Sequence, residues 1–222
     1  MQENKKINCL FIGISLLLLI LLSYIESLSP SYLVKSIIKL SLLISPIIIY
    51  SFITKESFKD IIRFNKLHNA KLLIILMILA YVGIIILYLL LRSQIDLSNI
   101  KDKLLHKEHL TKDNFIYIFL YIIFINSLLE EVFFRGFLFH LIDNKKYAYI
   151  FSALCFAIYH IAIIAAWFNI YIFIFAIVGL FVVGLFLQFI SNKYESIKAS
   201  WLIHALANVA INTIGVFMLF DL

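Results

Sequence analysis

The sequence predicts an all-α polytopic membrane protein with about seven transmembrane helices. Of its 222 residues, 64% are hydrophobic, whereas an ordinary soluble domain has roughly 45–50%. At about 20 residues per span, this apolar content is enough for about seven membrane-spanning helices. The mean hydropathy of +1.03 and the charged fraction of 14% agree. A soluble globular fold cannot bury this much apolar surface, so the membrane is an expected partner.

Seven apolar runs divide the chain, and each is expected to be a helix because only a helix satisfies its own backbone in lipid without a partner strand. The runs occupy about 7–25, 36–54, 72–91, 114–141, 147–166, 170–190 and 199–220. The first run follows Lys5 and Lys6, as in a signal peptide. Its length and the lack of a small-residue cleavage site favour a span that is retained.

Basic residues lie mostly in the short connections between these runs, where they set orientation. Their distribution predicts a multi-pass protein of the cell membrane with a cytoplasmic N-terminus. The segment 92–113 disagrees, since it would lie outside and yet carries both basic and acidic residues, and we expect an amphipathic surface segment there. The net charge of +6 therefore does not indicate nucleic acid as a partner. Cys9 and Cys155 lie inside apolar runs and are expected to be small hydrophobic side chains, not a disulfide or a metal pair.

The fourth apolar run contains three ionisable residues, Glu130, Glu131 and Arg135. A charge at the bilayer centre costs about 2.5–3.5 kcal/mol on insertion scales, so their presence needs an explanation. Glu131 and Arg135 are four residues apart on one helix face, with the acid first, which predicts an ion pair. Glu130 points about 100° away from Glu131. The sequence thus predicts one carboxylate without a partner, which is a candidate general base.

Two later spans supply polar residues of the kind that such a base needs. His160 lies in the fifth run, and His204 and Asn208 lie four residues apart on one face of the seventh. At about 1.5 Å per residue, Glu130 and the two histidines fall at similar depths in their helices. Taken singly, an intramembrane His or Asn more often forms a hydrogen bond to a neighbouring helix than it performs chemistry. Their coincidence in three separate apolar spans favours a functional site.

Three ordered motifs carry a resemblance to a known family: Glu130-Glu131-x-x-x-Arg135, Phe156-x-x-x-His160 and His204-x-x-x-Asn208. This set resembles the intramembrane CAAX-protease and bacteriocin-processing family, also called the Abi family. The resemblance covers roughly residues 127–212. It implies that residues 114–222 form the protease core, and that residues 1–113 form N-terminal transmembrane helices and loops.

The resemblance implies a glutamate-dependent endopeptidase. Glu130, with His160, would activate a water molecule, while His204 and Asn208 would hold the developing oxyanion and Glu131 and Arg135 would support the site. Carboxylates accept protons from water, and imidazole and carboxamide N–H groups are suitable oxyanion donors. No cofactor is expected on this interpretation. A zinc-dependent version stays open, with Glu130, His160 and His204 as ligands and a free fourth position.

The expected activity is hydrolysis of a peptide bond in a membrane-associated peptide or in a lipidated protein. The resemblance points to maturation of a secreted peptide or to bacteriocin immunity. A non-catalytic membrane immunity or regulatory protein of the same fold is the alternative, since a fold can persist without its chemistry. A transporter or proton relay also uses intramembrane Glu and His. Neither an internal repeat nor paired broken helices are evident in the sequence to favour it.

Overall fold

The structure, a computed structural model, describes residues 2–68, 71–111 and 113–220, and these ranges contain helices and no strand. The described helices, in chain order, are α1 (Gln2–Ser27), α2 (Tyr32–Thr54), α3 (Phe58–Ile62), α4 (Lys71–Leu91), η1 (Arg92–Gln94), α5 (Leu97–His106), α6 (Phe115–Leu120), η2 (Tyr121–Asn126), α7 (Ser127–Glu130), η3 (Glu131–Leu138), α8 (Lys145–Tyr159), α9 (Ile161–Ile164), α10 (Ile170–Lys193) and α11 (Ile197–Phe220). Seven of the described helical segments are long and apolar enough to cross a membrane. The predicted fold class is therefore confirmed.

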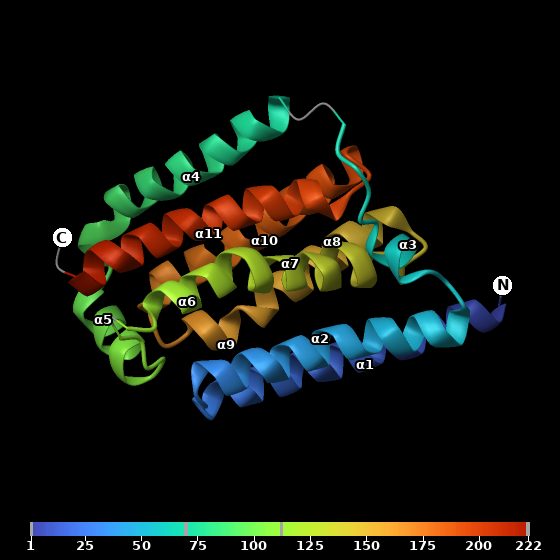
Figure 1. Ribbon diagram of the computed structural model, residues 1–222, viewed down its shortest axis with the longest axis horizontal. Coiled ribbons are helices and arrows are strands. Elements are labelled where there is room, and N and C mark those ends of the chain that lie inside the picture. Colours follow the sequence, from blue (N-terminus) through green and yellow to red (C-terminus); the bar gives the residue numbers. More distant parts are fainter. Residues whose placement is uncertain (1, 69–70, 112, 221–222) are drawn as a thin grey trace.

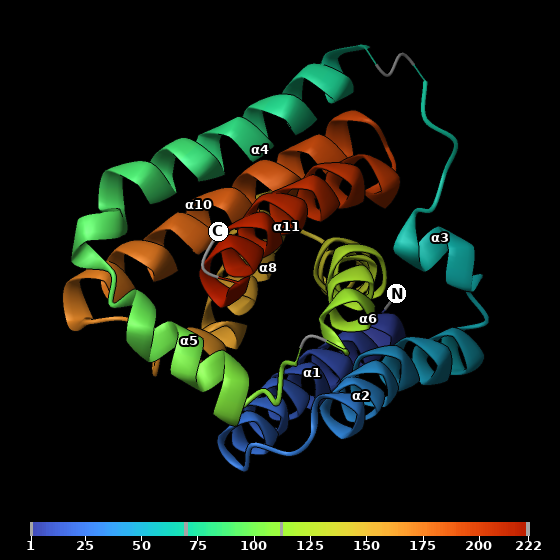
Figure 2. The same ribbon diagram turned by 60° about the vertical axis from the view of Figure 1, so that its left-hand side comes forward.

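One span runs through the middle of the bundle and positions the site. It is the continuous segment Phe115–Leu138, built from α6, η2, α7 and η3. On one side it packs against α2, and on the other against α8 and α11. Figures 1 and 2 show the α1–α2 pair on one flank of this central span, and α4 beyond α11 on the other. Residues from the second, fifth and seventh spans can therefore meet on the central one.

The central span is a mixture of α-helical and π-helical turns. Its segments Tyr121–Asn126 and Glu131–Leu138 are π-helical, and the short α-helical segment Ser127–Glu130 lies between them. A π-helical turn holds more residues than an α-helical turn and is frequently found at functional sites. Glu131 and Arg135 thus lie in a π-helical segment, and Glu130 directly precedes it.

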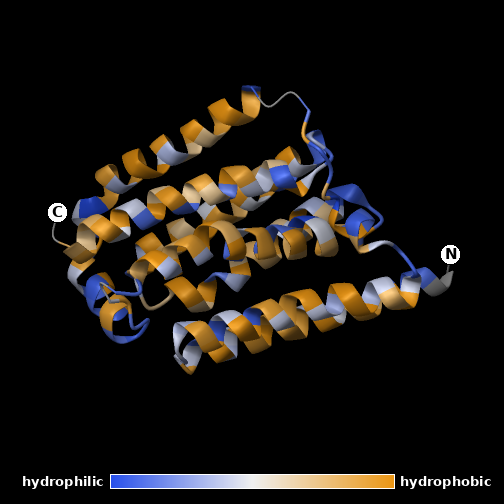
Figure 3. Cartoon of the chain, in the orientation of Figure 1, coloured by the Kyte–Doolittle hydropathy of each residue, from blue (hydrophilic) through white to orange (hydrophobic). Residues whose placement is uncertain are grey.

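Apolar packing around the central span forms the main core. Phe133, Phe134 and Phe137 are fully buried and pack in one cluster with Leu43 and Ile47 of α2. Many large apolar side chains of the long helices instead point outward. In Figure 3 hydrophobic colour dominates these helices, and hydrophilic colour gathers at the ends of the bundle. This outer surface is suited to lipid, because hydrocarbon tails do not penalise exposed Leu, Ile and Phe.

Two glycines allow helices to approach closely. A Cβ atom added to Gly184 of α10 would lie 3.0 Å from the Cα of Ala153 in α8. A Cβ added to Gly136 would lie 3.0 Å from the Cα of Ile62 in α3. Small residues at such crossings are typical of membrane helix packing, because dispersion contacts replace the hydrophobic drive that water supplies elsewhere.

Arg63 joins three parts of the chain at one end of the bundle. Its guanidinium donates to Asn192 Oδ1 at 2.6 Å, to the Arg135 carbonyl at 3.0 Å and to Ser191 Oγ at 3.2 Å. Partial burial lowers the pKa of this guanidinium from its ordinary value. The contact fixes the C-terminal part of the central span relative to the end of α10.

The segment 92–113, whose basic residues disagreed with the predicted orientation, packs on the bundle. Ile100 of α5 and Leu110 are buried, while Asp102 and His109 are exposed. Glu108 is held by an ion pair with Lys35 of α2 at 2.9 Å. The segment therefore has the amphipathic surface character expected of it. Its Glu108 forms an ion pair with a lysine of the second span.

Candidate functional site

Glu130 lies at the centre of the site and is almost completely buried, with 2% of its surface exposed. Its Oε1 accepts a hydrogen bond from Asn126 Nδ2 at 2.9 Å, and Lys39 Nζ of α2 lies 3.5 Å from the same oxygen. The prediction that Glu130 has no partner is therefore wrong. A buried carboxylate without compensation is costly, and here a cation and an amide supply that compensation.

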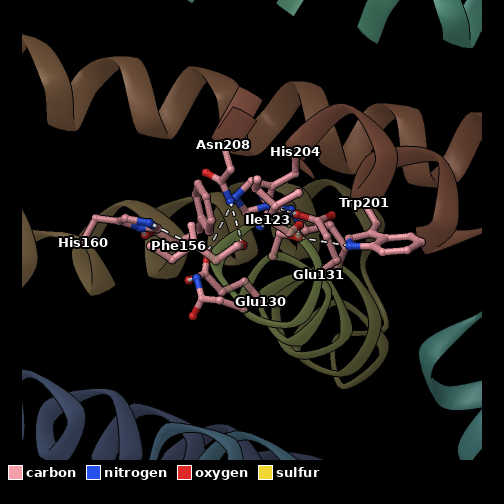
Figure 4. A network of polar contacts seen from close by, with 12 residues as sticks. Ile123, Glu130, Glu131, Phe156, His160, Trp201, His204 and Asn208 are labelled. Carbon is pink, nitrogen blue, oxygen red and sulfur yellow. Dashed lines mark hydrogen bonds and ion pairs between the residues drawn. The ribbon is translucent and has the colours of Figure 1, made fainter. Parts of the chain in front are cut away.

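Both predicted histidines face the other oxygen of Glu130. His160 Nε2 and His204 Nε2 each lie 3.8 Å from Glu130 Oε2. Figure 4 shows the three side chains converging from the central span, from the end of α8 and from α11. The structure thus brings Glu130, His160 and His204 together, although they are far apart in the sequence.

The opposite ring nitrogen of each histidine is also engaged. His160 Nδ1 lies 2.7 Å from the Phe156 carbonyl oxygen, and His204 Nδ1 lies 2.9 Å from Glu131 Oε1. Since both partners only accept hydrogen bonds, each Nδ1 carries a proton. In the neutral rings the two Nε2 atoms are then acceptors, and they point with Glu130 Oε2 toward one region. Three converging acceptors make a place for a molecule with O–H or N–H groups.

Glu131 and Arg135 form the predicted ion pair, which is confirmed at 3.4 Å between Arg135 Nη1 and Glu131 Oε1. Both side chains are fully buried. The Arg135 guanidinium also lies over the ring of Phe156, 4.0 Å from its centroid, where a cation is attracted by the π-electrons. Glu131 additionally orients His204, a role that its pairing with Arg135 did not predict.

Asn208 lies on the same α11 face as His204 (Figure 4). Its Nδ2 donates a hydrogen bond to the Ile122 carbonyl of η2 at 3.3 Å. The amide therefore lies beside the central span and is bonded to its backbone. One of its two N–H groups remains to serve another acceptor.

Two residues of the site were missed by sequence reasoning, Lys39 and Asn126. Lys39 donates to Asn126 Oδ1 at 2.7 Å, so the two act on Glu130 together. The available signal was a lysine inside the second apolar run, since ionisable residues within spans are rare and costly. Asn126 precedes Glu130 by four residues on the same helix and could have been found from that spacing.

The zinc alternative involves the same residues. Within residues 2–68, 71–111 and 113–220, no three His, Cys, Asp or Glu side chains are grouped to hold a metal ion. A tetrahedral zinc site needs its ligand atoms about 2.0–2.2 Å from one point. Glu130 Oε2 lies 3.8 Å from the Nε2 atom of each histidine, and the zinc-dependent version stays an alternative for experiment.

Fold and site together define a polytopic membrane protein with a buried carboxylate between two histidines. Residues 112–210 match the family described as type II CAAX prenyl endopeptidase Rce1-like. The matched segment includes all three motifs, so the predicted resemblance is confirmed over these residues, and the match supports a CAAX-type protease fold. Searches of curated proteins and of solved structures gave no significant match.

Proposed function

We propose that the protein is an intramembrane endopeptidase that hydrolyses a peptide bond in a membrane-associated peptide or a lipidated protein. The observation that carries this proposal is the convergence of Glu130 Oε2 with the Nε2 atoms of His160 and His204, each 3.8 Å away, inside the family-matched segment. A contact of this length between acceptors suits a water molecule that donates to both.

In the proposed reaction, Glu130 and His160 polarise this water and Glu130 takes its proton. The hydroxide attacks the scissile carbonyl carbon, and the carbonyl oxygen becomes an oxyanion. When the tetrahedral intermediate collapses, the C–N bond breaks and the proton held by Glu130 passes to the leaving amine. Proton transfer by a positioned group of this kind contributes about 10²–10⁴-fold to the rate.

His204 and Asn208 are proposed to stabilise the oxyanion. His204 donates through Nε2 only when both ring nitrogens carry protons, and Glu131 supports that form because its oxygen lies 2.9 Å from His204 Nδ1. Asn208 contributes its second amide hydrogen. Donors aimed at the developing charge in a site closed to bulk water are each worth about 2.7–4 kcal/mol in reported cases.

The experiment is cleavage of a quenched-fluorescent peptide library with lipidated members by the purified, detergent-solubilised protein. Replacing Glu130 with Gln should lower cleavage by about 10²-fold or more, because the amide cannot take the proton. Glu56→Gln is the matched control, since Glu56 is bound to His140 at 2.8 Å, away from the site. Full activity of Glu130→Gln would remove Glu130 as the base.

Two further arms separate the alternatives. Cleavage that survives a zinc chelator supports the metal-free mechanism proposed here, whereas loss with chelator and recovery with zinc would make the zinc version correct. A Glu130→Gln variant that keeps the immunity or regulatory effect of the wild-type protein in cells would favour the non-catalytic role.

A further inference from the structure

We propose that Lys39, from the second span, is a positioning residue of the site, which holds the Glu130 carboxylate in orientation and keeps it ionised. This inference rests on the proposed role of Glu130. It extends the site beyond the family-matched segment at residues 112–210, because Lys39 lies in α2.

A closed set of contacts fixes one oxygen of the carboxylate. Lys39 Nζ lies 2.7 Å from Asn126 Oδ1 and 3.5 Å from Glu130 Oε1. Asn126 Nδ2 lies 2.9 Å from that same Oε1. With Oε1 held by a cation and an amide, Oε2 is left facing the two histidines. The contacts thus decide which oxygen of Glu130 is available for chemistry.

The location of Lys39 argues against an incidental role. Its side chain is 15% exposed and lies between Ile38 and Leu40 in the second apolar run. The ammonium also lies 4.9 Å from the centroid of the Tyr159 ring, which adds a cation–π contact. Lys35, one helical turn earlier, instead contacts Glu26 at 2.8 Å and Glu108 at 2.9 Å. The two lysines of α2 therefore serve different carboxylates.

Charge balance around Glu130 depends on Lys39. The titratable and charged groups that surround Glu130 are Lys39, Tyr32, Tyr121, Glu131, Arg135, Tyr159, His160 and His204. Among these, Arg135 is in ion-pair contact with Glu131, and the histidines are neutral acceptors toward Glu130 unless protonated. Lys39 is the cation in contact with Glu130 itself. A cation within about 4–6 Å lowers the proton affinity of a carboxylate by roughly 10- to 1,000-fold, which favours the ionised form.

The test compares Lys39→Met, Lys39→Arg and Lys35→Met, with Glu130→Gln as the reference. The first readout needs no substrate: dicyclohexylcarbodiimide, a hydrophobic reagent, reacts with protonated carboxyl groups and not with carboxylates. Purified proteins are treated at neutral pH, and modification of the peptide containing Glu130 is followed by mass spectrometry. Lys39→Met should be modified at least about tenfold faster than wild type. Lys39→Arg and Lys35→Met should be close to wild type, and Lys39→Met combined with Glu130→Gln should lose the added modification.

The second readout is cleavage of the peptide that wild type cuts fastest. Lys39→Met should lower kcat by about tenfold or more, move the acid limb of the pH profile to higher pH, and leave KM nearly unchanged. Lys39→Arg should restore most of kcat.

Outcomes for the two proposals are distinguishable. An active Glu130→Gln variant would overturn the proposed base. If Glu130→Gln is inactive but Lys39→Met is modified as slowly as wild type, the positioning role is overturned. A rise in KM alone would instead assign Lys39 to substrate binding. If the library gives no cleavage, the carbodiimide result decides the role of Lys39 by itself.

Discussion

Removing one member of the Glu131–Arg135 ion pair should lower the stability of the protein more than replacing both members. Both are fully buried, with one contact of 3.4 Å between them. Arg135→Met is expected to destabilise the protein by about 3–5 kcal/mol, because Glu131 then stays buried without its cation. Unfolding in detergent, followed by circular dichroism, measures the change. Arg92→Met, at an exposed position, is the control.

The double variant Glu131→Gln with Arg135→Met provides the sharper comparison. It removes both charges and should recover part of the lost stability, since an uncharged pair carries no uncompensated charge. A double variant that is less stable than Arg135→Met would contradict this account.

Sequence reasoning predicted the Glu131–Arg135 contact and the grouping of Glu130 with the two histidines, but it missed Asn126 and Lys39. The Glu131–Arg135 contact follows from a spacing of four residues. The contact of Lys39 with Glu130 depends on how α2 packs against the central span, which no local spacing encodes. For that reason Lys39 was missed, even though its position in an apolar run marked it as unusual.

At the scale of elements, the crossing of α8 and α10 depends on Gly184. A valine there should destabilise the protein by about 1–3 kcal/mol, because its Cβ would meet the Ala153 backbone at 3.0 Å and the helices would have to move apart. Gly179→Val is the matched control in the same helix, since nothing lies within 4 Å of a Cβ at that position. Equal melting temperatures of the two variants in detergent would contradict the prediction.

The helices themselves could be predicted closely from the sequence, but their irregular turns could not. Continuous apolar runs can only be helices in lipid, and all seven predicted runs correspond to spans. The π-helical turns on either side of Ser127–Glu130 have no signal in hydropathy. A π-helical turn adds residues to the helix without changing its apolar character, so the hydropathy pattern does not locate it.

At the scale of the whole molecule, the charge distribution leads us to propose a cytoplasmic N-terminus. Lys55, in the connection after α2, and Ser98, in α5, are both exposed and belong to opposite sides in this topology. In a chain with Cys9→Ser and Cys155→Ala, a cysteine at position 98 should react with an impermeant maleimide in intact cells. A cysteine at position 55 should react only after permeabilisation. The reverse pattern would invert the topology.

The indole of Trp201 gives the molecule an optical probe where α11 contacts the central span. Its Nε1 donates to Ser127 Oγ at 3.0 Å and to the Phe124 carbonyl at 3.2 Å, joining α11 to the central span (Figure 4). The chain has two tryptophans, so Trp167→Phe leaves Trp201 as the sole tryptophan, which is excited selectively at a wavelength where tyrosine does not absorb. Its fluorescence then reports when the helix that carries His204 separates from the helix that carries Glu130, without any turnover of substrate.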